Sequence, residues 1–391
     1  MDRTFPTARG CDLRPRHAFH TLGLFASSVL CLLMFAGPIA AQDATQGEAR
    51  NESSEASPAG LLQSFDDLVE VSEVFVDVLA TDAEGQVVRD LGADDFIVEE
   101  DGESVELTSV SYYSTRYEDG ASETDVPSSR YLVFFLDDQS RFGNFGNRLM
   151  RQKLRAVRDA KKWVRDAMLP SDWMAVVSYD GDLRLHQDFT QDPELLQEAL
   201  QRAAVGGKPK PFRPGRREAL DRGRELEILS LMPTGPELEQ ASENIYSAMG
   251  LVGDSLGFLI GRKVMLLYTV GFGVKKGRTT VPDERYYPAL ETVLNDHNIA
   301  VYPIDLTPSG LNPKHEDFLT RLAEDTGGYY DPNFVGFFDP LQEVTSENFG
   351  YYLLTYRAER PSGEIGYQKL EVRAKDPSIT VRARTGYRYG L

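Results

Sequence analysis

The sequence predicts a doubly wound α/β domain with a largely parallel sheet, flanked by two β segments that join into one antiparallel β-sandwich. Apolar runs of strand length alternate with amphipathic stretches through residues 129–345, which is typical of a doubly wound domain. Alternating strand patterns occupy residues 70–117 and 350–389. The first of these segments is too short to bury a large core alone, so we expect the two to pack together.

The first 41 residues differ from the rest of the chain. Basic residues precede an apolar run at 22–35, and small residues follow, ending in Ala40 and Ala41. This order is typical of a secretory signal peptide, and we expect cleavage after Ala41. The alternative is an uncleaved membrane anchor, for which the apolar run is short. Residues 42–69 are polar and low in aromatics, which predicts a flexible spacer.

Charge and cysteine content exclude several classes of function. The 391 residues include 42 basic and 61 acidic ones, for a formal charge of −19. Because such a field repels phosphates, we expect no nucleic-acid partner. The two cysteines, Cys11 and Cys31, both lie in the predicted signal peptide. The exported chain is therefore expected to be secreted or periplasmic and to have no disulfide and no Cys-based zinc site.

The N-terminal β segment starts with alternating apolar residues at Val74, Val76 and Val78. Further along, Asp101 and Gly102 predict a tight turn between two strands. A polar stretch separates this segment from the α/β domain, which begins with an apolar run typical of a strand buried on both faces. The strands expected in the domain and tail are 131–136, 173–179, 183–189, 263–270, 299–304, 351–356, 367–374 and 380–387. The expected helices are 147–168, 192–200, 238–260, 283–295, 316–326 and 340–348.

Ligands of open α/β sheets bind at the carboxyl ends of the strands, near the switch in strand order. The first strand of the domain ends in an acidic turn, 137–141 (DDQSR), and a later strand ends at 268–271 (YTVG). Together with the order of helices, these segments resemble a von Willebrand factor A domain. Residues 75–113 and the closing strands resemble, more narrowly, the acidobacterial VWFA-related domain family. The resemblance spans residues 70–389 and implies a von Willebrand A-like fold.

The resemblance also implies a divalent cation site. Von Willebrand A domains often hold Mg²⁺ or Mn²⁺ through Asp-x-Ser-x-Ser, a threonine of a second loop and an aspartate of a third, all hard oxygen ligands. Here Asp137, Asp138 and Ser140 retain only Asp-x-Ser, and Thr234 is the candidate for the second loop. The third-loop aspartate falls at Val270, which offers no ligand.

A cation site of this kind is expected to be degenerate. Arg141 lies beside it and would repel a cation. We therefore expect no cofactor, with Mg²⁺ or Mn²⁺ binding as the alternative. Without a metal, the acids are expected to cap the following helix or to pair with Arg141.

The sequence predicts that the protein is not an enzyme. A Gly-x-Ser-x-Gly pattern occurs at 253–257 (GDSLG), but it lies inside the predicted helix 238–260 and not at the strand-to-helix turn that forms the elbow of α/β hydrolases. His186, His297 and His315 each stand alone in their stretch, so we expect no pairing of a nucleophile with a base. A secreted hydrolase is an alternative.

A basic, proline-rich insert occupies residues 206–235 of this acidic chain. Its candidate partner-binding residues are Lys208, Lys210, Arg213, Arg216 and Arg217. One interpretation is a contact for an acidic protein or an anionic envelope polymer, and the other is a mobile insert between helices. Both interpretations stay open.

The predicted function is therefore a secreted or periplasmic protein-binding module. It is expected to recognise another protein through the loops above the sheet, where Asp137, Asp138, Ser140 and Thr269 mark the surface. An envelope scaffold that binds no ligand at these loops is the alternative. Contact with a membrane is expected only if the signal peptide stays uncleaved, and the oligomeric state is left open.

Overall fold

In the computed structural model, the described residues belong to one compact unit. The described residues are 69–114, 126–127, 129–138, 146–207, 225–259, 261–277, 279–307, 316–330, 332, 336–347, 350–361 and 363–390. The predicted signal peptide and nearly all of the predicted spacer lie outside these ranges. Within them, no helix has both the length and the apolar character needed to cross a membrane.

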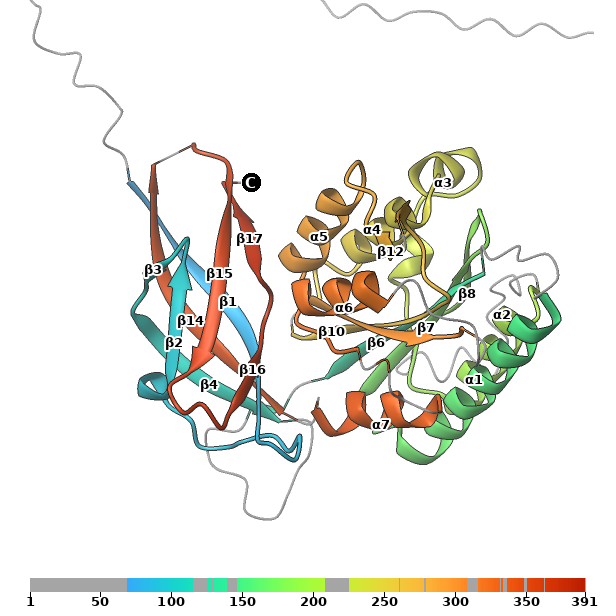
Figure 1. Cartoon of the computed structure of the whole chain (residues 1–391), viewed down its shortest axis with the longest axis horizontal. Helices are drawn as coiled ribbons and strands as arrows, with labels where there is room; N and C mark the ends of the chain where they lie inside the picture. The colour runs from blue at the N-terminus through green and yellow to red at the C-terminus, as the bar shows by residue number, and fades with distance from the viewer. Residues whose placement is uncertain are drawn as a thin grey trace, which may run out of the picture. The chain divides into compact units, whose positions relative to one another are not determined.

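The α/β part is built on a sheet that has six strands in the described residues (Figure 1). Its order is β13-β10-β6-β7-β8-β9, and the first four of these strands run parallel. β8 and β9 extend one edge in the antiparallel sense. The order of strands reverses at β6, because β7 is added on one side of it and β10 on the other. The strands are β6 (Arg130–Asp137), β7 (Asp172–Tyr179), β8 (Leu183–Thr190), β9 (Glu225–Leu226), β10 (Lys263–Thr269) and β13 (Ile299–Asp305).

Helices cover both faces of this sheet. The helices α1 (Gly146–Ala167), α2 (Pro193–Ala204) and α7 (Phe338–Glu347) share a core with one face. The helices α4 (Ile245–Ser255), α5 (Tyr287–Asp296) and α6 (Glu316–Asp325) share a core with the other face. β6 contributes to both cores, with Phe134 on one side and Phe135 on the other, each fully buried. This two-sided burial explains the continuous apolar run in its sequence.

The β segments from either side of the α/β part form one sandwich, as predicted. One sheet has the order β16-β1-β14-β4-β5 and the other β17-β15-β2-β3. β1 pairs antiparallel with β14 from Val69↔Pro361 to Val78↔Tyr352, and β2 pairs with β15. Each sheet therefore contains strands from both segments, and the two sheets share a core. The strands are β1 (Val69–Thr81), β2 (Phe96–Glu100), β3 (Glu103–Ser104), β4 (Leu107–Ser114), β5 (Val126–Pro127), β14 (Gly350–Pro361), β15 (Gly366–Ala374), β16 (Thr380–Arg382) and β17 (Gly386–Tyr389).

The predicted fold class is confirmed, but two local predictions differ from the structure. The predicted strand 380–387 is wrong, because two strands, β16 and β17, occupy this stretch and belong to different sheets. The predicted helix 238–260 is wrong, because two helices, α3 (Pro236–Ala241) and α4, occupy this stretch. Asn244 separates them. Its backbone is extended, and its Oδ1 accepts the N–H of Ser247 at 3.0 Å, which starts a new helix. Short 3₁₀ turns at Ala93–Asp95 and Leu229–Leu231 were likewise not predicted.

A small hairpin beyond β10 was also missed by the sequence analysis. It consists of β11 (Val274–Lys276) and β12 (Thr279–Val281). Gly273 enters it with a φ of 119°, and a Cβ at this position would collide with the backbone oxygen of Val281. Glycine is therefore required at the start of this hairpin. The predicted turn at Asp101 and Gly102 is confirmed, since both residues have positive φ.

Candidate functional site

Four polar residues gather at the carboxyl edge of the parallel sheet, and we call them the strand-end cluster: Asp137, Asp138, Lys153 and Thr269. β6 and β10 are parallel neighbours, with Leu136 paired to Tyr268. The residues that follow this pair, Asp137 and Thr269, therefore emerge at the same edge. Asp138 comes next along the chain, and α1 brings Lys153 to the same place.

Asp137 and Thr269 are held by each other. The Thr269 hydroxyl donates to Asp137 Oδ2 at 2.6 Å, and the same hydroxyl oxygen accepts the N–H of Gly271 at 2.8 Å. Thr269 is fully buried and Asp137 is nearly so. Burial, and then the Asp137 carboxylate, raises the pKa of the neighbouring Tyr179. Thr269 was predicted to mark a partner-binding surface. In the structure its side chain is buried, and its hydroxyl donates a hydrogen bond to Asp137.

Asp138 forms an ion pair with a buried ammonium. Lys153 Nζ lies 2.9 Å from Asp138 Oδ2, and the exposed fractions of the two side chains are 4% and 32%. The backbone N–H of Asp138 donates to the carbonyl of Tyr179 at 2.7 Å, which fixes the loop against the end of β7. The predicted partner of the acids was Arg141 or the next helix. The structure instead gives Asp138 a lysine, while Arg141 lies outside the described residues.

Both carboxylates of the strand-end cluster already have partners among the described residues. One carboxylate is engaged by the Thr269 hydroxyl, and the other has an ammonium at ion-pair distance. An ammonium held at this position repels a second cation and already neutralises one carboxylate. Within the described ranges there is no group of three or more His, Cys, Asp or Glu residues arranged to hold a metal.

Lys153 is the residue of this site that the sequence analysis missed. Its signal was present, because Lys153 falls on the buried stripe of α1, four residues after Leu149 and four before Val157. A charged residue on an apolar stripe is buried only when a partner is nearby. The sequence did not show that this stripe passes over the end of β6.

The other predicted site residues either have no described interaction with the strand-end cluster or lie outside the described residues. Thr234 is exposed in the segment before α3, and the interactions described for the cluster do not involve it. Ser140 lies outside the described residues, as do the candidate partner-binding residues Lys208, Lys210, Arg213, Arg216 and Arg217. Predictions about these residues stay predictions.

His186 has a serine partner that its isolated position in the sequence did not indicate. The antiparallel pairing of β7 with β8 brings Ser178 Oγ to 2.7 Å from His186 Nε2. Both residues are buried, at 5% and 4% exposed, and His186 Nδ1 has no hydrogen-bond partner in the described structure. Burial, followed by the nearby Arg202 guanidinium, lowers the pKa of His186 to about 4. The imidazole is therefore neutral at pH 7 and lacks the carboxylate that would orient it in a hydrolase triad.

The buried imidazole of His186 predicts that the free energy of unfolding decreases at acid pH. As the pH falls, the unfolded chain protonates His186 near pH 6.5 and the folded chain only near pH 4. The stability that neutral His186 contributes is therefore present above pH 6.5 and is lost as the pH falls from 6.5 toward 4. We expect this residue to account for roughly 2 kcal/mol of the stability lost between pH 7 and pH 5. Urea unfolding at both pH values should show a smaller loss in His186→Gln, and an equal loss would contradict the prediction.

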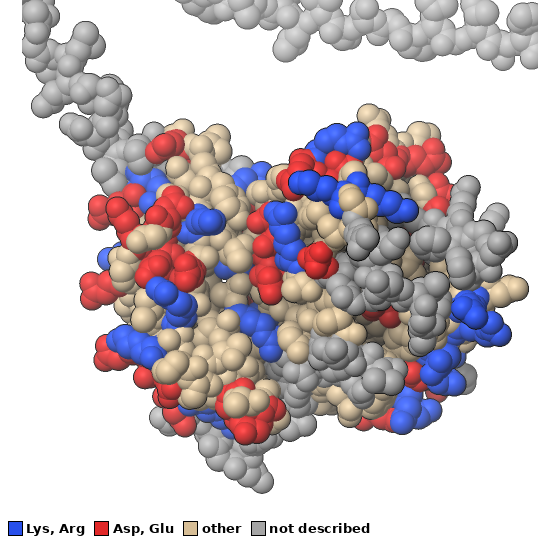
Figure 2. All heavy atoms as spheres, in the orientation of Figure 1, with Lys and Arg blue, Asp and Glu red and all other residues tan. Residues whose placement is uncertain are grey.

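The charges on the molecular surface are mixed on the face that Figure 2 shows. Lys and Arg side chains are interspersed with Asp and Glu side chains over the described residues in view. On this face there is no extended positive field of the kind that nucleic-acid binding requires.

No family model matches the sequence, and no curated protein matches it. The vWF domain of the type V pili tip protein Mfa5 from Porphyromonas gingivalis is 16% identical over 39% of this chain and 42% of that one, with a TM-score of 0.24. The chain thus spans less than half of that domain. An aerotolerance-related membrane protein from Bacteroides fragilis, with multiple mutations to serines, is 14% identical over 56% of this chain and 98% of its own, with a TM-score of 0.34. The ArnB paralog VWA2 from Sulfolobus acidocaldarius is 10% identical over 82% and 74%, with a TM-score of 0.29.

Proposed function

We propose that this chain, which has a von Willebrand A-like fold, is an exported protein-binding module that recognises a protein partner without a divalent cation. The partner binds at the carboxyl edge of the sheet, where open α/β sheets bind their ligands. The proposal is supported above all by the Lys153 ammonium, which lies 2.9 Å from Asp138 and supplies the positive charge that a metal ion would otherwise bring. The narrower resemblance to the acidobacterial family stays a prediction.

The β11–β12 hairpin is the part of this edge that we assign to the partner. It follows β10 directly, and its outer residues Val274, Lys275 and Lys276 are exposed. The hairpin is anchored at its far strand, because the Thr279 hydroxyl donates to Asp317 of α6 at 2.6 Å. An exposed apolar side chain on an anchored hairpin offers a partner a contact surface at little cost in conformational entropy.

Affinity capture from an envelope extract tests both parts of the proposal. We expect a chelator such as EDTA to leave capture of the main partner unchanged, because no metal is needed. We expect Val274→Asp to reduce capture about tenfold, the effect of losing roughly 1.4 kcal/mol of binding.

Ile365→Asp is the matched control for this experiment. Ile365 is even more exposed than Val274 but lies just before β15 in the sandwich. The Ile365→Asp variant should leave capture of the main partner unchanged. Loss of capture with EDTA, or equal capture by Val274→Asp and the original protein, would contradict the proposal. The exported protein used as bait is expected to begin at Gln42 on N-terminal sequencing.

The same proposal includes the absence of hydrolase activity. The Ser178–His186 pair is the arrangement in the described structure that most resembles a catalytic pair. Both residues are at most 5% exposed, so a substrate carbonyl has no access to the serine oxygen in this conformation. The pair instead satisfies two buried polar atoms, Ser178 Oγ and His186 Nε2, inside the core.

A further inference from the structure

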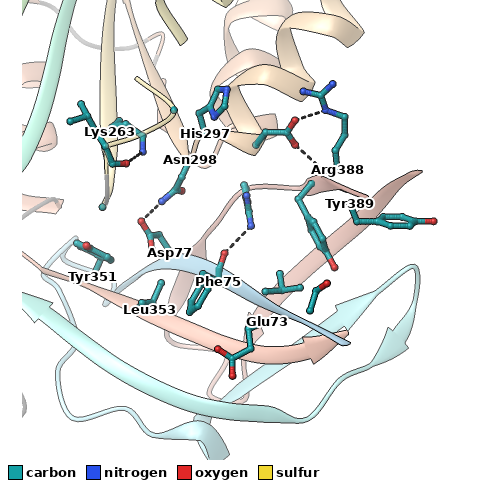
Figure 3. A pocket seen from close by; sticks show the side chains of 18 of the residues that line it. Glu73, Phe75, Asp77, Lys263, His297, Asn298, Tyr351, Leu353, Arg388 and Tyr389 are labelled. Atoms are coloured by element: carbon teal, nitrogen blue, oxygen red, sulfur yellow. Dashed lines mark hydrogen bonds and ion pairs between the residues drawn. The ribbon is translucent and has the colours of Figure 1, made fainter. Parts of the chain in front are cut away.

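A concave site lies at the opposite end of the parallel sheet from the strand-end cluster, and we call it the basal groove (Figure 3). It has a volume of about 760 Å³, within the range of small-molecule sites. Its walls come from β1, β14 and β17 of the sandwich and from the residues around the start of β10. Lys263, which lines it, is the first residue of β10, whereas Thr269 of the cluster is the last.

Aromatic side chains form much of the wall of the basal groove. They are Phe75, Tyr113, Tyr351, Tyr387 and Tyr389. Phe75 is 52% exposed even though the neighbouring Val74 and Val76 are buried in the sandwich core. An aromatic ring that stays half-exposed on the wall of a cavity is available to pack against an apolar ligand.

Charged groups at the floor of the groove are buried. Asp77 and Lys263 are 4% and 3% exposed. Asp77 accepts a hydrogen bond from Asn298, and Lys263 Nζ donates to the carbonyl of Leu259 at 2.7 Å. Lys263 thus has further N–H groups to offer a ligand, since an ammonium has three donors. Arg384 comes from the β16–β17 connection and donates to the carbonyls of Asn295 and Phe75, each at 2.8 Å.

At the floor, two lining cations face one buried carboxylate. The lining cations are Lys263 and Arg384, and both act on Asp77, as does Arg262 from outside the lining. Glu73, the other lining acid without a printed ion pair, is exposed. Burial raises the pKa of Asp77 and is its largest influence. Burial likewise lowers the pKa of Lys263, to about 8, despite the attraction of Asp77. At the mouth, Arg388 is already paired with Asp296 and His297 lies beside Asp254.

We propose that the basal groove binds a small carboxylate with an apolar, aromatic body. The ligand carboxylate approaches Lys263 and Arg384 and balances the excess positive charge, while its ring packs against Phe75. A charge-assisted hydrogen bond to a desolvated ammonium is among the stronger polar contacts in proteins. This site is independent of the protein-binding edge, because the two lie at opposite ends of β10.

Calorimetric titration of the purified full-length protein with two probes of like shape tests the proposal. 1-Naphthoate carries the expected negative charge, and 1-naphthylmethylammonium carries the opposite one. We expect naphthoate to bind about tenfold or more tightly than the amine, since a full charge interaction is worth at least 1.4 kcal/mol at such a site. Equal binding of both probes, or no binding of naphthoate, would overturn the proposal.

Three variants in the groove and one control variant outside it test where naphthoate binds. Lys263→Met should weaken naphthoate binding about tenfold, whereas Asp77→Asn should strengthen it severalfold because it removes a competing anion. Phe75→Ala, at a half-exposed position that the fold tolerates, should weaken both probes. Lys153→Met, at the far end of the sheet, should change neither. Unchanged naphthoate binding in Phe75→Ala together with Asp77→Asn would show that the probe binds elsewhere, even if Lys263→Met does not fold.

Discussion

Arg130→Met is expected to lower the free energy of unfolding by about 3–5 kcal/mol, the usual cost of breaking a buried ion pair from one side. Arg130 Nε and Nη2 each lie 2.6 Å from a different carboxylate oxygen of Asp172, so the pair is bidentate. The Asp172 side chain is completely buried. Without Arg130, its carboxylate would keep, among the described residues, the hydrogen bond from the N–H of Leu169.

The double variant Arg130→Met with Asp172→Asn separates loss of the pair from loss of packing. Removing both charges leaves no uncompensated ion in the core, so much of the stability should return. The Asn side chain can still accept the N–H of Leu169. Urea unfolding followed by the fluorescence of Trp163 and Trp173, both in the α/β part, measures each variant. A double variant no more stable than Arg130→Met would contradict this account.

The sequence predicted the layers of the fold because burial leaves a local pattern. The run at β6 is apolar at every position from 131 to 136, and Val74, Val76 and Val78 alternate as a strand with one buried face does. Both patterns can be recognised from a few consecutive residues of a single strand. The association of residues 70–117 with 350–389 was predictable because neither segment could bury its apolar residues alone.

Interactions between elements were not predictable in the same way. Arg130 meets Asp172 because β6 and β7 pair with these residues opposite each other. Lys153 meets Asp138 because α1 crosses the end of β6. Neither the strand register nor the helix crossing can be read from a short stretch of sequence. The sequence analysis therefore gave the acids only partners nearby in the chain, the start of the following helix or Arg141. For the same reason it considered His186 alone, although the pairing of β7 with β8 brings its ring to Ser178, whose own backbone partner is Arg184.

Asp138→Ala is expected to lower the free energy of unfolding by about 3 kcal/mol, near the low end for breaking a buried pair. The loss comes from the partner, because Lys153 is only 4% exposed and its ammonium would be left without a counter-ion. Lys153→Met should cost much less. It removes the buried charge and leaves Asp138, which is 32% exposed and can be hydrated. The double variant should therefore resemble Lys153→Met and be more stable than Asp138→Ala.

Asp180→Ala is the matched control for this asymmetry. The Asp180 side chain is 33% exposed, almost the same as Asp138, and pairs with Arg184 at 2.5 Å. Arg184, however, is 27% exposed, so water can solvate it when the carboxylate is gone. The expected cost is under about 1 kcal/mol, as for other solvent-exposed pairs. Equal losses for the two aspartates would mean that the Lys153 ammonium is not buried as the structure shows.

Magnesium titration of the same variants connects this pair to the proposed metal-independent binding. If the ammonium takes the role of the cation, the original protein should give no binding heat at millimolar Mg²⁺. Lys153→Met should gain affinity for Mg²⁺, because the variant lacks the ammonium that lies 2.9 Å from Asp138 and repels a second cation. Tight Mg²⁺ binding by the original protein, lost in Asp138→Ala, would show that Lys153 moves aside for a metal and that partner recognition depends on it.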